Sequence, residues 1–530
     1  MKFSIVFVLM ALLLVTVVSA QPIGISDCQG LQDISNNLGE EYVLLNSVDC
    51  ANFSFVPISD FSGVLDGNGF TVVGLHLDFF GVDDVGLFAS TNGATIKGIN
   101  LADFYVRGRW HIGGLVGKSE NTLIHNVNVL EGFIEGNEQV GGLVGYGIAN
   151  TEIFNSFSSA TVKSSRVGGI IGSAWNSKVE FSSFNGTVIG TSYSTGGIVG
   201  QVSSALINYT KSYGSVGGGS RVGGIVGNMG GTVNVHNSVS YADVSGSYRV
   251  GGFVGDGGTV TSFIHNSFST GSATAEAELG GFVGQYAQAN NSYSVAMVNP
   301  PFYFDGSDDS VCGFGATPYN TSFWDLDLVP IDTGWADAVG LSTAEMMSLS
   351  TFVDAGWDIA DVNSHSGELW VIDDGNSYPW LYWPVVGCMD SGAHNFDEDA
   401  VIDSGFCLFD VSLGCADFRA SNFDLMANFD DGSCEYEEEE DDESNGSVPP
   451  VSPPPSSRGG GGGWPVEESA SLDEDEEDKV VSVPVSDVRG PLTKWWSDLP
   501  EYKHVVWFFI AGLVFYMLFN MEKKVRRKRR

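Results

Sequence analysis

The chain of 530 residues contains 69 glycines, 17 prolines and 7 cysteines, which excludes a collagen and a small disulfide-stapled domain. Hydrophobic residues make up 43% and aromatic residues 12%, so most of the chain can bury a core. The 65 Asp and Glu against 24 Lys and Arg give a net charge of −41, which repels phosphates and excludes nucleic acid as a partner of the folded part.

Residues 1–20 have the features of a secretory signal peptide. Lys2 precedes an apolar run over residues 5–18, and Val18-Ser19-Ala20 offers a cleavage site of small residues. The alternative is an uncleaved membrane anchor, but the run is short for a span. We therefore expect the signal to be removed and the mature chain to be extracellular.

Residues 21–80 are expected to form an N-terminal cap and an entry coil. Residues 31–38 predict a short amphipathic helix that covers the open edge of the β-structure, because open edges invite aggregation. Cys28 and Cys50 flank this cap, and in an oxidising compartment we expect them to pair.

One short motif recurs through residues 81–300, as in Ile112-Gly113-Gly114-Leu115-Val116-Gly117. Copies follow one another at intervals of 27 to 29 residues, and self-similarity at a fixed period of this size predicts a solenoid. The reference glycines of the eight copies are Gly86, Gly113, Gly141, Gly168, Gly196, Gly223, Gly251 and Gly280.

Each repeat reads as three short strands and three turns, with no stripe of helical period. We therefore predict an all-β chain folded as a right-handed parallel β-helix. Paired glycines are expected to turn with positive φ and to let neighbouring coils approach closely. Asn126, Asn155, Asn237 and Asn266 occupy equivalent places, so their amides are expected to bond along a column.

The Gly-Gly-Leu-Val-Gly copies resemble GLUG-motif repeats, which occur in large adhesin-like surface proteins of bacteria and archaea. The resemblance spans residues 28–383. Phe323-Trp324-Asp325, Gly356-Trp357-Asp358 and Tyr378-Pro379-Trp380-Leu381 look like the C-terminal cap of that family, so residues 301–384 are expected to form this cap. Cys312 is expected to be buried and unpaired.

Residues 385–436 contain two copies of one Asp-rich module, offset by 27 residues. They resemble a small cysteine-paired repeat found at the C-terminal ends of secreted surface proteins, which implies the disulfides Cys388–Cys407 and Cys415–Cys434. Zinc is the alternative, but no Cys-x-x-Cys or His pair supports it. Clustered loop oxygens are candidates for calcium, although Asn and Asp also dominate ordinary turns. The candidate ligands are Asp390, Asn395, Asp397, Asp403, Asp417, Asn422, Asp424 and Asp430.

Residues 437–503 are acidic and rich in Pro and Gly, a composition typical of a disordered, extended stalk. Residues 504–521 form an uncharged stretch just long enough for one transmembrane helix. The basic residues of 522–530 place this tail in the cytoplasm by the positive-inside rule. The alternative for this end is a buried helix with a basic tail.

Three further observations bear on chemistry. Sequons on an extracellular face are candidate glycosylation sites, here Asn52, Asn185, Asn208, Asn290, Asn320 and Asn445. Parallel β-helices can host polysaccharide lyases and hydrolases, which need two carboxylates at one cleft, and the acids near the first coils are Asp66, Asp78, Asp83, Asp84 and Asp103. His236 and His265 are expected to stack on adjacent coils in one column with Phe154 and Phe181, which favours packing over a metal site.

The expected function is a non-enzymatic, adhesin-like protein of the cell surface, anchored by one membrane span. It would bind glycans, other cells or envelope components through its turns and coil faces. We assign no catalytic residues and no cofactor other than the candidate calcium. The alternatives are a polysaccharide lyase or glycoside hydrolase on the same fold, and a purely structural envelope protein.

Overall fold

The computed structural model describes residues 22–258, 261–299, 311–315, 317–318, 321–329 and 338–408, together with 413–414, 422, 429–430 and 435. The predicted signal peptide, the stalk, the membrane span and the basic tail lie outside these residues, as do Cys415 and Cys434. Within the described part, no helix is long and apolar enough to cross a bilayer.

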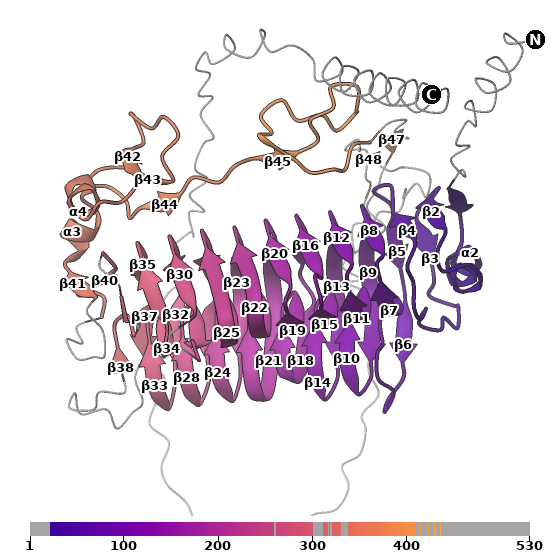
Figure 1. Cartoon of the computed structure of the whole chain (residues 1–530), viewed down its shortest axis with the longest axis horizontal. Helices are drawn as coiled ribbons and strands as arrows, with labels where there is room; N and C mark the ends of the chain where they lie inside the picture. The colour runs from indigo at the N-terminus through magenta and orange to yellow at the C-terminus, as the bar shows by residue number, and fades with distance from the viewer. Residues whose placement is uncertain are drawn as a thin grey trace, which may run out of the picture. The chain divides into compact units, whose positions relative to one another are not determined.

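The described chain is a parallel β-solenoid, as predicted, with coils wound through two sheets (Figure 1). Sheet A consists of β1 (Ile23–Ile25), β2 (Glu41–Leu44), β4 (Val64–Asp66), β7 (Phe88–Asn92), β8 (Thr95–Lys97), β11 (Val116–Glu120), β12 (Leu123–His125), β15 (Val144–Ile148), β16 (Glu152–Phe154), β19 (Ile171–Trp175), β20 (Lys178–Glu180), β22 (Val199–Asn208), β25 (Val226–His236), β29 (Val254–Asp256), β30 (Phe263–His265), β34 (Val283–Gln285), β35 (Gln288–Asn290) and β39 (Thr317–Pro318).

Sheet B consists of β3 (Val48–Asp49), β5 (Thr71–Val73), β6 (His76–Asp78), β9 (Asn100–Arg107), β10 (Trp110–Gly113), β13 (Asn128–Glu135), β14 (Glu138–Gly141), β17 (Phe157–Ser158), β18 (Thr161–Gly168), β21 (Ser183–Gly196), β23 (Lys211–Gly217), β24 (Ser220–Gly223), β26 (Val239–Ser240), β27 (Asp243–Ser245), β28 (Tyr248–Gly251), β31 (Phe268–Ser269), β32 (Ser272–Thr274), β33 (Ala277–Gly280), β36 (Tyr293–Ser294), β37 (Met297–Asn299), β38 (Val311–Cys312), β40 (Phe323–Asp325) and β41 (Val339–Leu341). Because β41 still pairs in parallel with β40, the ladder continues into the segment predicted to be the C-terminal cap.

The repeat glycines lie on equivalent rungs. Gly113 pairs with Gly141, and Gly141 pairs with Gly168. The same register continues through the later copies. The repeat period therefore equals one coil of the solenoid, as the spacing predicts.

The prediction of three strands per repeat holds for some coils and fails for others. The coil that follows Gly196 contains three strand segments, β22, β23 and β24. The coil that follows Gly113 contains four strand segments, β11 and β12 in sheet A and β13 and β14 in sheet B. Its extra corners come from residues with positive φ, which break a strand without breaking the coil: Asn121 at 47° and Asn126 at 54°.

The expected positive φ of the reference glycines is also wrong. In six of the eight copies the left-handed residue lies two places earlier, as at Gln139 with a φ of 58°, and no reference glycine has a positive φ. The glycine pairs are required by close approach instead. A Cβ on Gly169 would lie under 3.0 Å from the carbonyl oxygen of Gly197 and from the ring of Phe184.

The interior holds stacked Val, Ile and Leu side chains and a column of buried hydroxyls. Ser238 Oγ donates to the His236 carbonyl oxygen at 2.7 Å and accepts from the Thr210 amide of the preceding coil at 3.1 Å. Ser267 repeats both bonds one coil later. Because these hydroxyls satisfy backbone groups at a bend, burying them is not costly.

The N-terminal end is closed by α2 (Cys28–Asp33) and the 3-10 helix η1 (Ile34–Asn36). Leu31 and Ile34 are fully buried against the first coils. The helix starts three residues before the predicted one, because Asp27 caps it by accepting from the Gly30 amide at 2.7 Å. The predicted Cys28–Cys50 disulfide is formed and ties α2 to the segment after β3.

After the solenoid come α3 (Thr343–Met346), α4 (Leu349–Asp354), β42 (Ile359–Asp361), β43 (Trp370–Ile372) and β44 (Trp380–Leu381). They pack laterally on the outer face of sheet B. Trp357 and Trp370 share a hydrophobic cluster with Phe268 and Tyr293 of the coils, and the Tyr293 hydroxyl donates to the Pro379 carbonyl. Residues 343–383, here called the lateral segment, therefore cover one side of the solenoid in addition to following its last coil.

The first Asp-rich module pairs β45 (Val386–Gly387) with β46 (Ile402–Asp403) and contains the predicted Cys388–Cys407 disulfide. In the second module β47 (Leu413–Gly414) pairs with β48 (Phe429–Asp430) at the same offset. Both modules share an amide clasp: Asn395 Oδ1 accepts from the Leu408 amide at 2.6 Å, and Asn422 Oδ1 from the Glu435 amide at 2.7 Å. In their described residues, the two modules therefore share one strand pair and one amide clasp.

Candidate functional site: an amide and aromatic cleft

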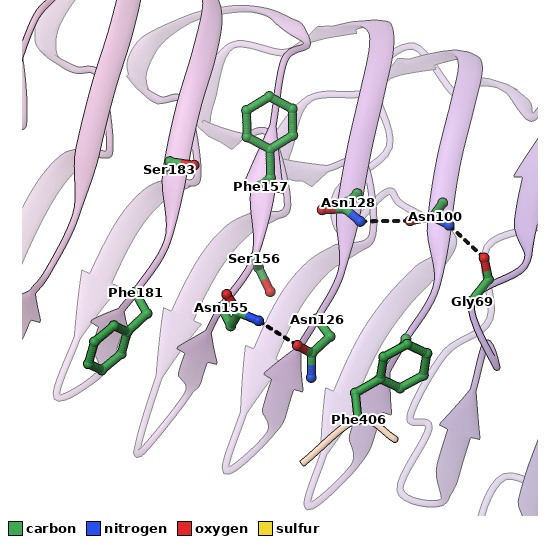
Figure 2. Close-up of a pocket in the computed structure, with 11 residues that line it drawn as sticks. Gly69, Asn100, Asn126, Asn128, Asn155, Ser156, Phe157, Phe181, Ser183 and Phe406 are labelled. Atoms are coloured by element: carbon green, nitrogen blue, oxygen red, sulfur yellow. Dashed lines mark hydrogen bonds between the residues drawn. The ribbon is translucent and has the colours of Figure 1, made fainter. Parts of the chain in front are cut away.

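A cleft lies along the bends at which each coil passes from sheet A to sheet B (Figure 2). In Asn126-Val127-Asn128 the middle residue is fully buried, so its two neighbours point outward. The same alternation occurs at Asn155-Ser156-Phe157 and at Phe181-Ser182-Ser183 on the following coils. Two parallel columns of outward side chains result, with a furrow between them.

The first column contains Asn126, Asn155 and Phe181, with φ of 54°, 44° and 51°. Asn tolerates this left-handed conformation because its short amide bonds locally, whereas Phe is strained there. Asn155 Nδ2 donates to Asn126 Oδ1 at 2.6 Å (Figure 2). This confirms the first half of the predicted amide column.

The second half of that column forms between Asn237 and Asn266, at 3.3 Å. Phe181 and Tyr209 stand between the two halves, with ring centroids 4.8 Å apart. The predicted column is therefore two short ladders separated by an aromatic pair.

The second wall is the outward column of sheet B, formed by Asn100, Asn128, Phe157 and Ser183. Asn128 Nδ2 donates to Asn100 Oδ1 at 2.8 Å, and Asn100 Nδ2 donates to the Gly69 carbonyl oxygen at 2.8 Å. These bonds fix the amide planes. Further along the column, Val239 and Phe268 are covered by the lateral segment, so the cleft occupies the part of this face that the segment leaves open.

The first Asp-rich module closes one end of the cleft with Phe406 (Figure 2). Asn126 Nδ2 donates to the Ser404 carbonyl oxygen at 2.9 Å, and the Phe406 ring lies against Gly98. Beyond the other end, the Trp383 ring packs over Lys211 Nζ at 4.0 Å. The cleft between them has a volume of about 320 Å³, the size of a small-ligand pocket.

His125 lies next to Asn126, the residue that bonds to the first Asp-rich module. Its Nδ1 is 2.8 Å from Asn126 Nδ2, and because the amide nitrogen only donates, Nδ1 must accept. The pKa of His125 lies below its usual value. The main cause is burial, and the second is the positive charge of Lys97. A neutral His125 is therefore part of the contact between the module and the coil.

The chemistry of the cleft is polar but uncharged. No ionisable side chain is among the described residues that line it. Asn128 and Asn155 each use one amide hydrogen on a neighbouring coil, and among the described residues no partner is found for their Oδ1 atoms. Amide oxygens beside the rings of Phe157 and Phe181 suit a ligand with hydroxyl groups and an apolar face.

Sequence reasoning missed this cleft, although it placed the amide column that forms one wall. The available signal was an outward pair flanking one buried residue, repeated at equivalent places of three consecutive copies.

The candidate calcium ligands of the first module cap turns. Asp390, Asp397 and Asp403 each accept from the amide two residues ahead, at 2.9 to 3.0 Å, and Asn395 forms the clasp. Across the described residues, no group of three or more His, Cys, Asp or Glu could hold a metal ion. In the second module Asn422 forms the matching clasp, Asp430 ends β48, and Asp417 and Asp424 lie outside the described residues. Calcium binding stays a prediction.

The candidate glycosylation sites differ in accessibility. Asn52 and Asn185 are exposed. Asn208 Oδ1 accepts from Asn237 Nδ2 at 3.1 Å, and Asn290 Oδ1 accepts from the Thr321 hydroxyl at 3.3 Å. Asn320 and Asn445 lie outside the described residues. Modification of any of these sites stays a prediction.

The acids near the first coils do not converge. Asp66 forms an ion pair with Lys97 at 3.0 Å, and Asp83 and Asp84 pair with Arg109 and His111. Asp78 is 4.0 Å from Arg107, and Asp103 takes a left-handed turn position with a φ of 47°.

The rings of His236 and His265 stack with centroids 5.1 Å apart, as expected for neighbouring coils. The predicted alignment with Phe154 is confirmed, because the pairings run from Phe154 through Glu180 and Asn208 to His236. The predicted alignment with Phe181 is wrong, because Phe181 belongs to the next column.

Comparison with known proteins finds a family match, a curated relative and a solved structure. The GLUG motif family matches residues 136–163. Halomucin of Haloquadratum walsbyi is 32% identical over 103 residues, which is 18% of this chain and 1% of halomucin. A solved Bacteroides ovatus structure, provisionally described as an immunoglobulin A1 protease, is 16% identical with a TM-score of 0.35, over 69% of this chain and 94% of that one.

Proposed function

We propose that this chain is an adhesin-like protein of the cell surface that binds uncharged glycans in the amide and aromatic cleft. The observation that carries the proposal is the composition of the cleft, in which fixed amides face phenylalanine rings and ionisable groups are absent from its described lining. A sugar ring offers hydroxyls to the amides and an apolar face to the rings.

Location is the second part of the proposal. We infer that residues 1–20 direct export and that residues 504–521 anchor the chain with its C-terminus inside. Two disulfides support an oxidising compartment, and the partial likeness to halomucin fits a surface protein. Protease treatment of intact cells should remove the solenoid from the cell fraction, and protection of the chain would contradict a surface location.

Glycan-array binding by the full-length chain, solubilised in detergent, tests the activity. The Phe157→Asn variant places in the cleft the residue that the preceding coil carries at Asn128, so it should fold. We expect it to lose at least tenfold in affinity for the glycans bound by the wild type. Trp175→Ala removes an exposed ring of sheet A outside the cleft and serves as the control. If the wild-type protein binds none of the uncharged glycans on the array, the proposal is refuted.

A further inference from the structure

The opposite edge of the coils, where sheet B passes into sheet A at the Gly-Gly motif, carries a row of exposed rings. Trp110, Tyr193 and Tyr248 are 45%, 49% and 39% exposed. Each lies three residues before a reference glycine of its coil, so the three rings follow one column along the solenoid, with Tyr193 in a stretch where the register to the preceding coil shifts. We call this column and the arginines beside it the Gly-Gly edge. Large rings in a row on the surface are not required by the core and indicate an interaction surface.

Each ring is held by an arginine. The guanidinium carbon of Arg109 lies 4.6 Å from the centroid of Trp110, and that of Arg249 lies 5.0 Å from Tyr248. Arg166 contacts the ring of Tyr193 at 5.5 Å. Rings fixed in this way lose little conformational freedom when a ligand binds, which favours affinity.

The charges of the Gly-Gly edge balance. Arg109 Nε donates to Asp83 at 2.6 Å. Arg166 pairs with Glu138 at 3.2 Å, and Arg249 pairs with Glu278 at 2.9 Å.

Arg221, the fourth arginine of the Gly-Gly edge, is also paired with a carboxylate. Arg221 Nε lies 3.0 Å from Asp256, a buried carboxylate that also accepts from Arg249 at 2.7 Å. Four guanidinium groups therefore meet four carboxylates. A polyanion gains no net attraction here, and an uncharged ligand is not penalised.

The spacing of the rings selects an extended ligand. Trp110 and Tyr193 are three coils apart, and Tyr248 lies two coils further. With about 4.8 Å between strands, the rings stand roughly 14 Å and then roughly 10 Å apart along the axis. The coil spacing is close to the rise of one unit in an extended β-linked polysaccharide, so a straight chain of this kind can present successive sugar faces to the row.

We propose that the Gly-Gly edge binds an extended, uncharged, β-linked polysaccharide that lies along the solenoid axis. This surface is separate from the cleft at the opposite bend, and its recognition depends on the length of the saccharide. A disaccharide spans less than the distance between Trp110 and Tyr193, whereas a hexaose reaches both rings.

Calorimetric titration of the full-length protein in detergent tests the inference. The probes are disaccharides and hexaoses of β-1,4-linked glucose, N-acetylglucosamine and mannose. We expect at least one hexaose to bind tenfold or more tightly than its disaccharide. Trp110→Ser and Tyr193→Ser should each abolish this preference without lowering the unfolding temperature, because serine occupies the same column at Ser220.

Two control variants separate this inference from the proposed cleft. Tyr382→Ser removes a ring that is 52% exposed on the lateral segment and should leave the length preference intact. Phe157→Asn should weaken disaccharide binding and keep the gain from disaccharide to hexaose. Equal affinities for every hexaose and its disaccharide, or a length preference that survives in Trp110→Ser, would overturn the inference.

Discussion

Replacing Phe181 by Asn separates the fold from the proposed activity. A non-glycine residue in the left-handed region costs about 1–2 kcal/mol, and Asn bears this conformation more easily than Phe. Asn at this position also extends the ladder from Asn155, which adds about 0.5–1.5 kcal/mol. Against this, the ring contacts with Phe154 and Tyr209 are lost, at about 0.5–1.5 kcal/mol each. These terms nearly cancel, so we expect the free energy of unfolding to stay within about 1 kcal/mol of the wild type.

Saccharide binding should respond differently. Phe181 is one of the two rings of the coils that line the cleft, so Phe181→Asn should weaken binding of a cleft glycan by at least tenfold in calorimetric titration. The matched control is Tyr209→Asn, which makes the same change at a φ of 49° on the next coil, outside the cleft lining. A folded Phe181→Asn protein that binds as tightly as the wild type would refute the assignment of the cleft.

Three further predictions concern stability, pH and calcium. Gly169→Ala should lower the free energy of unfolding by about 1–3 kcal/mol or more because its Cβ meets the neighbouring coil, whereas Gly230→Ala, with 3.7 Å to the nearest atom, should not; a denaturant titration that ranks them equally would contradict the packing argument. The pKa of His125 is lowered, so its contribution to stability is complete above about pH 6.5 and decreases as the pH falls from there toward the folded-state pKa; the protection factors for hydrogen exchange around Asn126, which are corrected for the slower intrinsic exchange in acid, should therefore fall in mild acid, and a flat profile of protection would count against it. Calcium bound by the Asp-rich modules should raise the unfolding temperature, and the rise should be smaller in Asp397→Asn. An unfolding temperature that does not change with calcium would refute calcium binding by the modules.

The solenoid could be predicted because its determinants are local and repeated. Glycine recurs wherever a coil bends against its neighbour, and the period places these glycines on one rung before any contact is known. The number of strands per coil could not be predicted in this way. It depends on whether a residue with positive φ ends a strand, as Asn121 does after β11, or lies within one, as Gln139 does in β14.

The cleft depends on long-range contacts that a repeat does not encode. Its two walls follow from alternation around Val127 and Ser156, but its closed end requires the approach of Phe406, some 280 residues away along the chain from Asn126. Likewise, the lateral packing of Trp357 and Trp370 on the coils decides how much of the outward column stays open. Such contacts belong to segments outside the periodic pattern.

The bends explain why both proposed binding surfaces lie at the edges of the coils. A residue at a bend points outward and does not contribute to the stacked core, so its identity is limited mainly by backbone conformation. Asn126, Phe181 and Tyr209 occupy one column with nearly the same φ, yet they present an amide, a phenyl ring and a phenol. Coils can therefore exchange these side chains without changing the fold. A solenoid whose interior repeats glycine, apolar side chains and serine is consequently a scaffold on which a row of outward side chains can vary from coil to coil.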